Sequence, residues 1–405
     1  MPAGPHPLRE GPRGALAAAL GVTRIARLTG LDRTGVEVAS AIRPRAHVLQ
    51  VTNGKGEAPE EAAAGALLEA AELFAAERAV VETWDSAAAL EARAGPAAVV
   101  SPRALAPDGG EAGWDDVRLA WRAGRDVSTG APVLVPAHVV HVPPADGPWL
   151  GPALLRWTSN GMGASPDRAA ALLHALLEVI ERDRVARALP EGFTEAELAR
   201  RLVDPAGCAR GAPRTAALAA RIEGSGLRVF LLDLTEPTQR GRGRGRGRGP
   251  AGPGPAPGPI SAAFAGTPDL AIPTAAALLL DVEGGPVPVA AGYACRLTRD
   301  EALRAALLEA AQSRATEIHG AREDVAAGDR HAAAALRALL ESARPTPALR
   351  RIPDLRASSA AAATRAIALR LRRAGLRAVA VELDAPAGVA VVKVLVPGLL
   401  LSELL

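Results

Sequence analysis

Apolar residues recur at helical spacing in several stretches of the chain. Residues 58–78, 165–189 and 299–325 place alanine, leucine and valine three and four positions apart. This spacing is typical of helices that bury at least one face. We therefore expect three long helices in these stretches, and shorter helices at residues 331–342 and 363–373.

Strands are expected where apolar runs are short and end at glycine, proline or charged residues. This pattern predicts strands at residues 228–234, 377–383 and 389–396. Further extended runs occur at residues 79–82, 97–100 and 132–142. Because strands and helices alternate, the predicted class is α/β to α+β.

Two segments follow neither pattern. Residues 1–20 open with a run rich in proline, glycine and arginine, and we expect this N-terminal segment to be disordered. In residues 236–259, five arginines alternate with glycine before a proline- and glycine-rich run, which predicts a flexible insertion. The folded protein is thus expected in two parts, residues 21–235 and 260–405.

Composition and charge narrow the classes of function. The net charge is only +3 over 405 residues, so we expect no nucleic-acid partner. RNA binding through the arginine–glycine run stays a weak alternative, because that run lacks aromatic residues for base stacking. Two cysteines form no disulfide framework, and no stretch is typical of a signal peptide or membrane span. A cytoplasmic protein without membrane contact is the expectation.

A glutamate recurs at the same place in the three long predicted helices. Ala-Leu-Leu-Glu occupies residues 66–69, 175–178 and 306–309. A second acidic or amide residue follows three positions later, which gives the pairs Glu69 and Glu72, Glu178 and Glu181, and Glu309 and Gln312. Residues three apart share a helix face, so each helix presents two side-chain oxygens in one direction.

The middle helix carries the most informative pair. Its other positions are apolar on nearly all sides, so Glu178 and Glu181 are expected on a buried helix. Buried carboxylates need a cation, and Mg²⁺ prefers oxygen ligands and often shares them with phosphates. Arg182 and Arg314 are placed to meet such phosphates. A solvated helix face is the alternative for any single pair.

Other site patterns are absent or incomplete. Gly54-Lys55-Gly56 lacks the upstream glycine of a phosphate-binding loop, and Gly161-Met162-Gly163 lacks the third glycine of a dinucleotide fingerprint. A diiron site would need Glu-x-x-His pairs, which the three helices lack. Cys295 is expected to be a buried structural thiol rather than a nucleophile.

With their flanking residues, these helical segments resemble the YcaO family. The resemblance is carried by residues 52–56 and 65–72, by residues 158–161 with 174–183, and by residues 309–314 with 320–324. It covers residues 22–400 outside the insertion. It implies a YcaO-like fold with mixed sheets, in which long helices converge on a site for ATP and Mg²⁺.

The resemblance also implies roles for individual residues, although it identifies no catalytic residue. Magnesium or its shell would be held by Glu69, Glu72, Glu178, Glu181 and Glu309. The nucleotide would be bound or enclosed by Lys55, Ser159, Asn160, His174, Arg182, Gln312, Arg314 and Arg322.

Members of that family activate peptide amides, which sets the expected function. They phosphorylate the amide oxygen after a nucleophile has added, and loss of phosphate leaves an azoline, a thioamide or an amidine. The protein contributes positioning and charge neutralisation. Because residues 401–405 lack the proline-rich tail frequent in azoline-forming members, thioamide formation with a TfuA-type partner is the preferred subtype.

Departures from the family pattern keep a second hypothesis open. Gly65 and Leu73 stand where the family often has serine and arginine, and Pro166 and Ala170 where it often has asparagine and glutamate. These changes favour a non-catalytic accessory or scaffold subunit, for example in ribosomal-protein methylthiolation. The expected partners are a peptide or protein substrate and a TfuA-like or leader-peptide-binding protein, and a homodimer also stays open.

Overall fold

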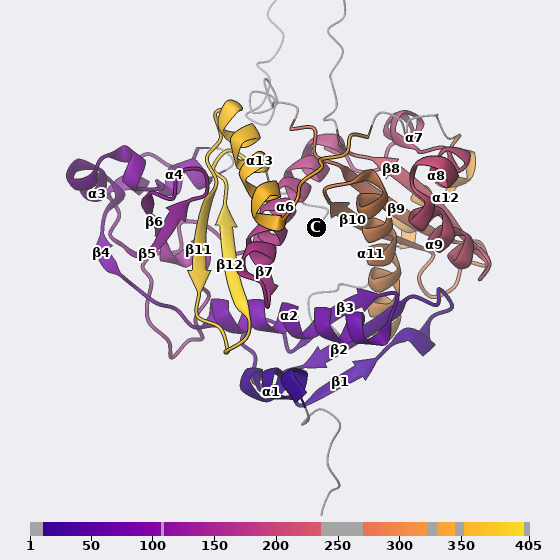
Figure 1. Cartoon of the computed structure of the whole chain (residues 1–405), viewed down its shortest axis with the longest axis horizontal. Helices are drawn as coiled ribbons and strands as arrows, with labels where there is room; N and C mark the ends of the chain where they lie inside the picture. The colour runs from indigo at the N-terminus through magenta and orange to yellow at the C-terminus, as the bar shows by residue number, and fades with distance from the viewer. Residues whose placement is uncertain (1–10, 107–108, 236–269, 322–329, 345–351, 401–405) are drawn as a thin grey trace, which may run out of the picture.

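The computed structural model describes residues 11–106, 109–235, 270–321, 330–344 and 352–400 (Figure 1). The predicted insertion at residues 236–259, the predicted nucleotide contact Arg322 and residues 401–405 lie outside the described residues.

The described helices include three long ones, α2, α6 and α11, which cover the three Ala-Leu-Leu-Glu segments. The helices are α1 (Gly11–Leu20), α2 (Pro59–Glu77), α3 (Ala87–Ala94), α4 (Pro102–Leu105), α5 (Ala137–Val140), α6 (Arg168–Ala188), α7 (Glu195–Arg201), α8 (Pro205–Gly211), α9 (Pro213–Glu223), α11 (Arg299–His319), α12 (Arg330–Ser342) and α13 (Ala360–Arg373). Short 3-10 turns are η1 (Thr29–Leu31), η2 (Pro96–Ala98) and η3 (Trp114–Asp116).

The strands form three sheets, in which every pairing between the named strands is antiparallel. The first has the order β1 (Arg24–Arg27), β2 (Glu37–Ile42), β3 (Val51–Gly56), and the second the order β10 (Val289–Cys295), β9 (Thr274–Asp281), β8 (Leu227–Asp233). The third has the order β4 (Thr83–Asp85), β5 (Leu119–Asp126), β11 (Val379–Leu383), β12 (Ala390–Leu395), β7 (Met162–Ser165), and β6 (Pro132–Pro136) also pairs with β5. Because the strand pairing is antiparallel, the fold is α+β rather than α/β within the predicted range of classes.

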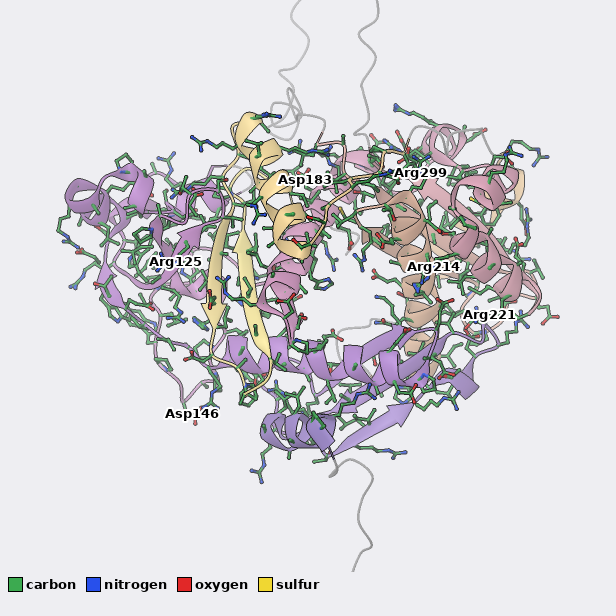
Figure 2. All side chains as sticks on the ribbon, in the orientation of Figure 1. Arg125, Asp146, Asp183, Arg214, Arg221 and Arg299 are labelled. Carbon is green, nitrogen blue, oxygen red and sulfur yellow. The ribbon has the colours of Figure 1, made fainter. Side chains whose placement is uncertain are left out.

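The last described residues return to α6. The backbone N–H of Leu400 donates to Asp183 Oδ1 at 3.0 Å, and Arg187 Nε donates to the same oxygen at 2.7 Å. Figure 2 shows Asp183 in the upper middle of the view, and the residue belongs to the last turns of α6. The carboxyl end of the described chain is therefore fixed to a helix that also carries two of the recurring glutamates.

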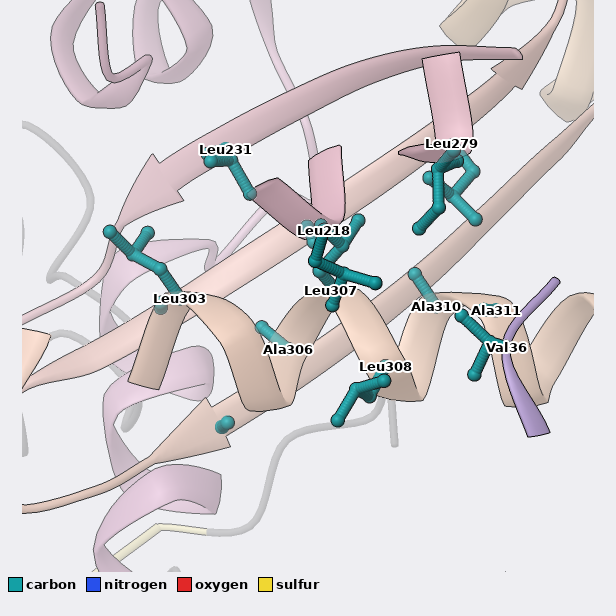
Figure 3. Packing of buried hydrophobic residues seen from close by; sticks show 14 of the residues in the cluster. Val36, Leu218, Leu231, Leu279, Leu303, Ala306, Leu307, Leu308, Ala310 and Ala311 are labelled. Atoms are coloured by element: carbon teal, nitrogen blue, oxygen red, sulfur yellow. The ribbon is translucent and has the colours of Figure 1, made fainter. Parts of the chain in front are cut away.

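Strand β9 is buried over its whole length because helices cover both faces of its sheet. Ala275, Ala277 and Leu279 belong to a core with α9 and α11, part of which Figure 3 shows. The intervening residues, such as Leu278, belong to a second core with α7 and α12. Successive side chains of a strand point to opposite faces, so a strand between two layers must be apolar throughout.

Each of the three long helices packs against a glycine of a neighbouring strand. A Cβ atom on Gly54 of β3 would lie 2.0 Å from Ala62 O of α2. A Cβ on Gly163 of β7 would lie 2.4 Å from Ala171 O of α6, and one on Gly292 of β10 would lie 2.1 Å from Ala310 N of α11. A larger residue cannot fit at these positions, so the glycines allow helix and strand backbones to approach closely.

Several predicted boundaries are corrected by the structure. Residues 11–20, expected to be disordered, form α1, in which Ala17 and Leu20 are buried. The third long helix ends at His319 rather than at residue 325, because Gly320 adopts a left-handed conformation with φ of 64°. Gly320 is thus a typical helix C-cap.

The short extended runs were predicted less well than the long helices. Residues 79–82 contain no strand, and β4 begins only at Thr83. Residues 97–100 hold the end of η2 and one isolated bridge, and residues 132–142 split into β6 and the short helix α5. The strands at residues 228–234, 377–383 and 389–396 are present with shifts of one or two residues.

Candidate functional site

The three glutamate-bearing helices form a ring with three strands. α2 contacts β7, β7 contacts α6, α6 contacts β10, β10 contacts α11, α11 contacts β3, and β3 contacts α2. In Figure 1 these elements surround the centre of the molecule. We call the glutamates that these helices contribute, Glu69, Glu72, Glu178, Glu181 and Glu309, the carboxylate site.

Helix α2 holds its two glutamates by backbone hydrogen bonds from neighbouring strands. Glu69 Oε2 accepts from the N–H of Asn53 in β3 at 2.7 Å. Glu72 accepts from the N–H of Ala164 in β7. Burial, followed by the nearby charges of Glu178 and Glu69, raises the pKa of Glu72 well above its ordinary 4.5. The Glu72 carboxylate therefore lies close to a carboxylate of another helix.

Helix α6 contributes a second pair of glutamates, and their pKa values are raised as well. Burial raises the pKa of Glu178 to about 7, with Arg182 opposing and Glu181 and Glu309 reinforcing the shift. Glu181 Oε2 accepts from the N–H of Cys295 at 2.8 Å. Burial and the charge of Glu309 raise the pKa of Glu181 as well. The negative charge of Glu309 on α11 thus contributes to the raised pKa values of both α6 glutamates.

Helix α11 contributes Glu309, which has a lysine beside its carboxylate. Lys55 Nζ donates to Glu309 Oε2 at 2.8 Å, and Tyr293 N donates to Oε1 at 3.4 Å. Burial opposes ionisation, but the charge and hydrogen bond of Lys55 prevail, so the pKa of Glu309 is lowered. Gln312 lies half-buried one turn further along α11.

A buried lysine borders the site from the third sheet. Lys393 of β12 is 2% exposed, and its Nζ donates to Thr158 O at 2.6 Å. Burial lowers the pKa of Lys393 to about 8, while Glu178 and Glu72 act in the opposite direction. Lys393 is therefore a cation held against two helices of the carboxylate site and against the loop before β7.

Two buried polar atoms at the site lack a protein partner. Among the described residues, neither Asn160 Oδ1 nor Arg182 Nε has a hydrogen-bond partner. Arg182 lies 3.8 Å from Glu178 Oε1 through another nitrogen. Buried donors and acceptors are rarely left unpaired in native proteins, so these atoms point to a bound polar ligand.

The donor set fits a metal that shares its ligands with phosphate. Within the described residues, no three His, Cys, Asp or Glu side chains are grouped closely enough to hold an ion by themselves. Mg²⁺ commonly takes one or two carboxylates and completes its shell with water and phosphate oxygens. The carboxylates would hold such an ion, and the nearby arginine and lysine side chains would face the phosphates.

His174 and Ser159 lie where solvent can enter. Both are exposed to solvent. Nevertheless, burial, then Arg296 and Lys55, lower the pKa of His174 to about 4, so its ring is neutral at pH 7. A side chain that is accessible and yet surrounded by protein lines a concave surface. We infer that His174 lies on the wall of an open site.

Arg314 is engaged elsewhere in the protein. Its Nε donates to Asp32 Oδ1 at 3.0 Å and its Nη2 to Asp281 Oδ2 at 2.8 Å, while Nη1 donates to Val287 O. All three charged side chains are at most 3% exposed. Arg314 thus joins α11 to β9 and to the segment after η1, instead of extending into the carboxylate site.

Sequence reasoning overlooked two cations of this site. Lys393 lies beside Glu178 and Glu72, and the charge of Arg296 acts on both His174 and Glu181. A signal for Lys393 was present, because the chain has only two lysines, and both are at the site. Cys295 is fully buried, as expected, and burial raises the pKa of its thiol to about 12.

A family profile and two relatives extend over most of the chain. The profile described as "YcaO cyclodehydratase", ATP- and Mg²⁺-binding, matches residues 53–240 and 262–400. A protein of Methanothermobacter thermautotrophicus is 30% identical over 396 residues, which are 94% of this chain and 90% of the relative. A protein of Rhizobium leguminosarum bv. trifolii, named for its place in the tfuA 3′ region, is 30% identical over 313 residues, 75% of this chain and 64% of the relative.

Solved structures show the same fold. A heterocyclase in complex with substrate and cofactor superposes with a TM-score of 0.67 at 18% identity, covering 94% of this chain and 50% of its own. The YcaO protein of Methanopyrus kandleri bound with AMPPCP and Mg²⁺ has a TM-score of 0.62 at 20% identity, covering 95% of this chain and 87% of its own.

Within the described residues, none of the helices has the length and apolarity needed to cross a membrane.

Proposed function

Because the chain belongs to the YcaO family, whose members bind ATP and Mg²⁺, we propose that it uses Mg²⁺–ATP to phosphorylate a peptide backbone amide. One observation carries this proposal. Glutamates of α2, α6 and α11 are buried near one another, and burial, reinforced by the charges of neighbouring glutamates, raises the pKa values of Glu72, Glu178 and Glu181. Such crowding is costly without a cation and is relieved by a divalent metal.

The roles of the chain's own residues follow from their charges. The carboxylates hold Mg²⁺, while Lys55, Arg182 and Lys393 neutralise phosphate oxygens. Bound ATP supplies the phosphoryl group that turns the amide oxygen into a good leaving group. The protein keeps its cations in fixed positions beforehand, which is how an active site stabilises developing charge. Asn160 and Gln312 complete the polar lining of the nucleotide site.

The preferred product is a thioamide. The support is the relative named for the tfuA 3′ region, which matches three quarters of this chain. A TfuA-type protein would then deliver sulfide to the amide carbon, and the peptide would come from a separate substrate. An azoline requires no such partner, because its nucleophile is a side chain of the peptide itself.

A nucleotide-binding accessory subunit is the second candidate, and one position favours it. Gly65 packs against β3, where its Cβ position lies 3.2 Å from Gly54 Cα. The family often has serine there, so α2 lacks a hydroxyl group that an active member would offer. Such a subunit would bind ATP but would not turn it over on a peptide.

Calorimetry followed by mass spectrometry separates these candidates. The purified chain should bind Mg²⁺–ATP, and Glu178→Gln and Glu181→Gln should weaken binding at least tenfold, while Glu341→Gln on α12 should not. With peptide, sulfide and a TfuA-type protein, replacement of one oxygen by sulfur supports thioamide formation, and loss of one water supports azoline formation. Binding without product favours the accessory subunit, and absence of binding by the wild type excludes both.

A further inference from the structure

A second concave region lies outside the carboxylate site, beneath a long segment without helix or strand. This segment, residues 141–161, connects α5 to β7. Figure 2 shows Asp146 at its outer end, at the edge of the molecule. Long ordered loops of this kind are usually functional. We call the concavity of about 500 Å³ beneath it the apolar hollow, and its lining includes His138, His141, Pro143, Trp149, Leu155 and Trp157.

The hollow is apolar but contains two histidines with unused hydrogen-bonding capacity. His138 is 7% exposed, and neither of its ring nitrogens has a partner among the described residues. His141 is 1% exposed, and its Nε2 likewise has none. Burial lowers both pKa values to about 4, so the rings are neutral at pH 7. A neutral imidazole offers one donor and one acceptor, which is the complement of a peptide group.

The mouth of the hollow is aromatic and open to solvent. Trp149 is 70% exposed and stacks on Trp84, with ring centroids 5.3 Å apart. Exposed tryptophan is unusual on a protein surface and is enriched where peptides and proteins bind. The lining therefore combines an apolar wall, an aromatic rim and unpaired polar atoms at depth. This is the usual composition of a specific ligand pocket.

The hollow and the carboxylate site share a boundary. Trp157 lines the hollow, and Lys393 Nζ lies 5.5 Å from the centre of its ring. The same Nζ donates to the carbonyl of the next residue, Thr158, and feels the charges of Glu178 and Glu72. A ligand in the hollow would thus be separated from the phosphate-binding cations by one side chain.

We propose that the apolar hollow receives an apolar side chain of the substrate peptide, one neighbour of the amide that is activated. The peptide group of that residue would hydrogen-bond to His138 and His141, and its side chain would pack against Trp149, Leu155 and Trp157. The proposal rests on the proposed function, because it takes the carboxylate site to be the place of phosphoryl transfer. It assigns the substrate a preference for a leucine-like residue beside the modified position.

Tryptophan indole signals in NMR spectra of the whole chain provide the test. The probe is N-acetyl-leucinamide, and N-acetylglycinamide is the control for the missing side chain. N-acetyl-leucinamide should shift the Trp149 and Trp157 signals saturably, whereas Trp114, which lies in η3 away from the hollow, should not respond. His138→Phe, which keeps a ring but removes both nitrogens, should weaken probe binding about tenfold, and Trp149→Ala should also weaken it. Leu369→Ala on the exposed face of α13 should not.

Mg²⁺–ATP then distinguishes a substrate subsite from an unrelated pocket. Through Lys393 and Trp157, bound nucleotide should change the probe affinity about fivefold, a usual size for coupling between sites. Probe binding that is indifferent to nucleotide, equal shifts by both probes, or a hollow closed by a second copy of the chain in sedimentation would overturn the proposal. Probe binding itself is measured without ATP, so failure of the hollow and failure of nucleotide binding are separate results.

Discussion

Lys55 Nζ lies 2.8 Å from Glu309 Oε2, and this ion pair joins β3 to α11 inside the carboxylate site. Both side chains are one-quarter exposed, so the pair itself contributes little to stability, about 1 kcal/mol or less. Its importance is electrostatic, because it places a cation beside the carboxylates. The only other lysine, Lys393, borders the same site from β12.

Replacing Lys55 by alanine should therefore weaken nucleotide binding more than it weakens the fold. The loss of one charge-assisted contact to phosphate predicts about a tenfold or larger increase in Kd for Mg²⁺–ATP by calorimetry. Arg304→Ala is the matched control, because Arg304 of α11 pairs with Glu57, just after β3, at 2.7 Å. Equal changes in Kd in both variants would show that Lys55 acts by joining β3 to α11 and not by contacting phosphate.

Glu178 makes stability depend on pH in a defined direction. Its folded-state pKa is about 7, against an ordinary value of 4.5. Between these values the folded protein keeps a proton that the unfolded chain has released, so the free energy of unfolding falls as pH rises from about 4.5 to 7. The decrease from this group is at most about 3 kcal/mol. Glu178→Gln should flatten the curve measured by urea denaturation at pH 5 to 8.

Magnesium should reverse this pH dependence. Because Mg²⁺ binds the ionised carboxylates, it should stabilise the wild type more at pH 8 than at pH 5, and removal with a chelator should restore the decline. Glu341→Gln, an exposed substitution on α12, should reproduce the wild-type curve. If Mg²⁺ stabilised the protein equally at pH 5 and pH 8, the metal would not be bound by carboxylates with raised pKa values.

Much of this site followed from the sequence, because its glutamates repeat within helices. A spacing of three residues fixes which side chains share a helix face, so the pairs on α2, α6 and α11 could be placed without a structure. Their convergence needed the family resemblance, since spacing within one helix does not determine which helices meet. Arg314 shows the limit, because its partners Asp32 and Asp281 come from distant segments.

The strands around the site were harder to predict than the helices. β3 is Val-Thr-Asn-Gly-Lys-Gly and β10 is Val-Ala-Ala-Gly-Tyr-Ala-Cys, and neither has the bulky alternating pattern typical of strands. Their small residues are required by tertiary packing, because α2 and α11 lie directly against Gly54 and Gly292. Local propensity cannot reveal such a requirement.

Replacing Arg314 should lower the stability of the fold and should change the affinity for Mg²⁺–ATP little. Replacement of Arg314 by methionine leaves the buried Asp32 without its cation and leaves Asp281 with Arg33 alone, and breaking a buried ion pair usually costs about 3–5 kcal/mol. The folded fraction of Arg314→Met should nevertheless bind Mg²⁺–ATP with a Kd within a few-fold of the wild type. Arg182→Met provides the contrast, because Arg182 has an unpaired nitrogen at the site. A larger affinity loss in Arg314→Met than in Arg182→Met would make Arg314 a phosphate contact.

Gly292→Ala should displace α11 and thereby disturb the site without touching a polar residue. The added Cβ would lie 2.1 Å from Ala310 N and 2.4 Å from Ala306 O, both backbone atoms that cannot move away as a side chain would. Relief requires the helix to shift, and Glu309 shifts with it. Overpacking of this kind costs about 1–3 kcal/mol or more. We expect a lower Tm together with weaker Mg²⁺–ATP binding at temperatures where the variant is folded.

Gly30→Ala is the matched control, because no atom lies within 4 Å of its Cβ position. Normal affinity in Gly292→Ala would mean that the distance between β10 and α11 does not set the position of Glu309.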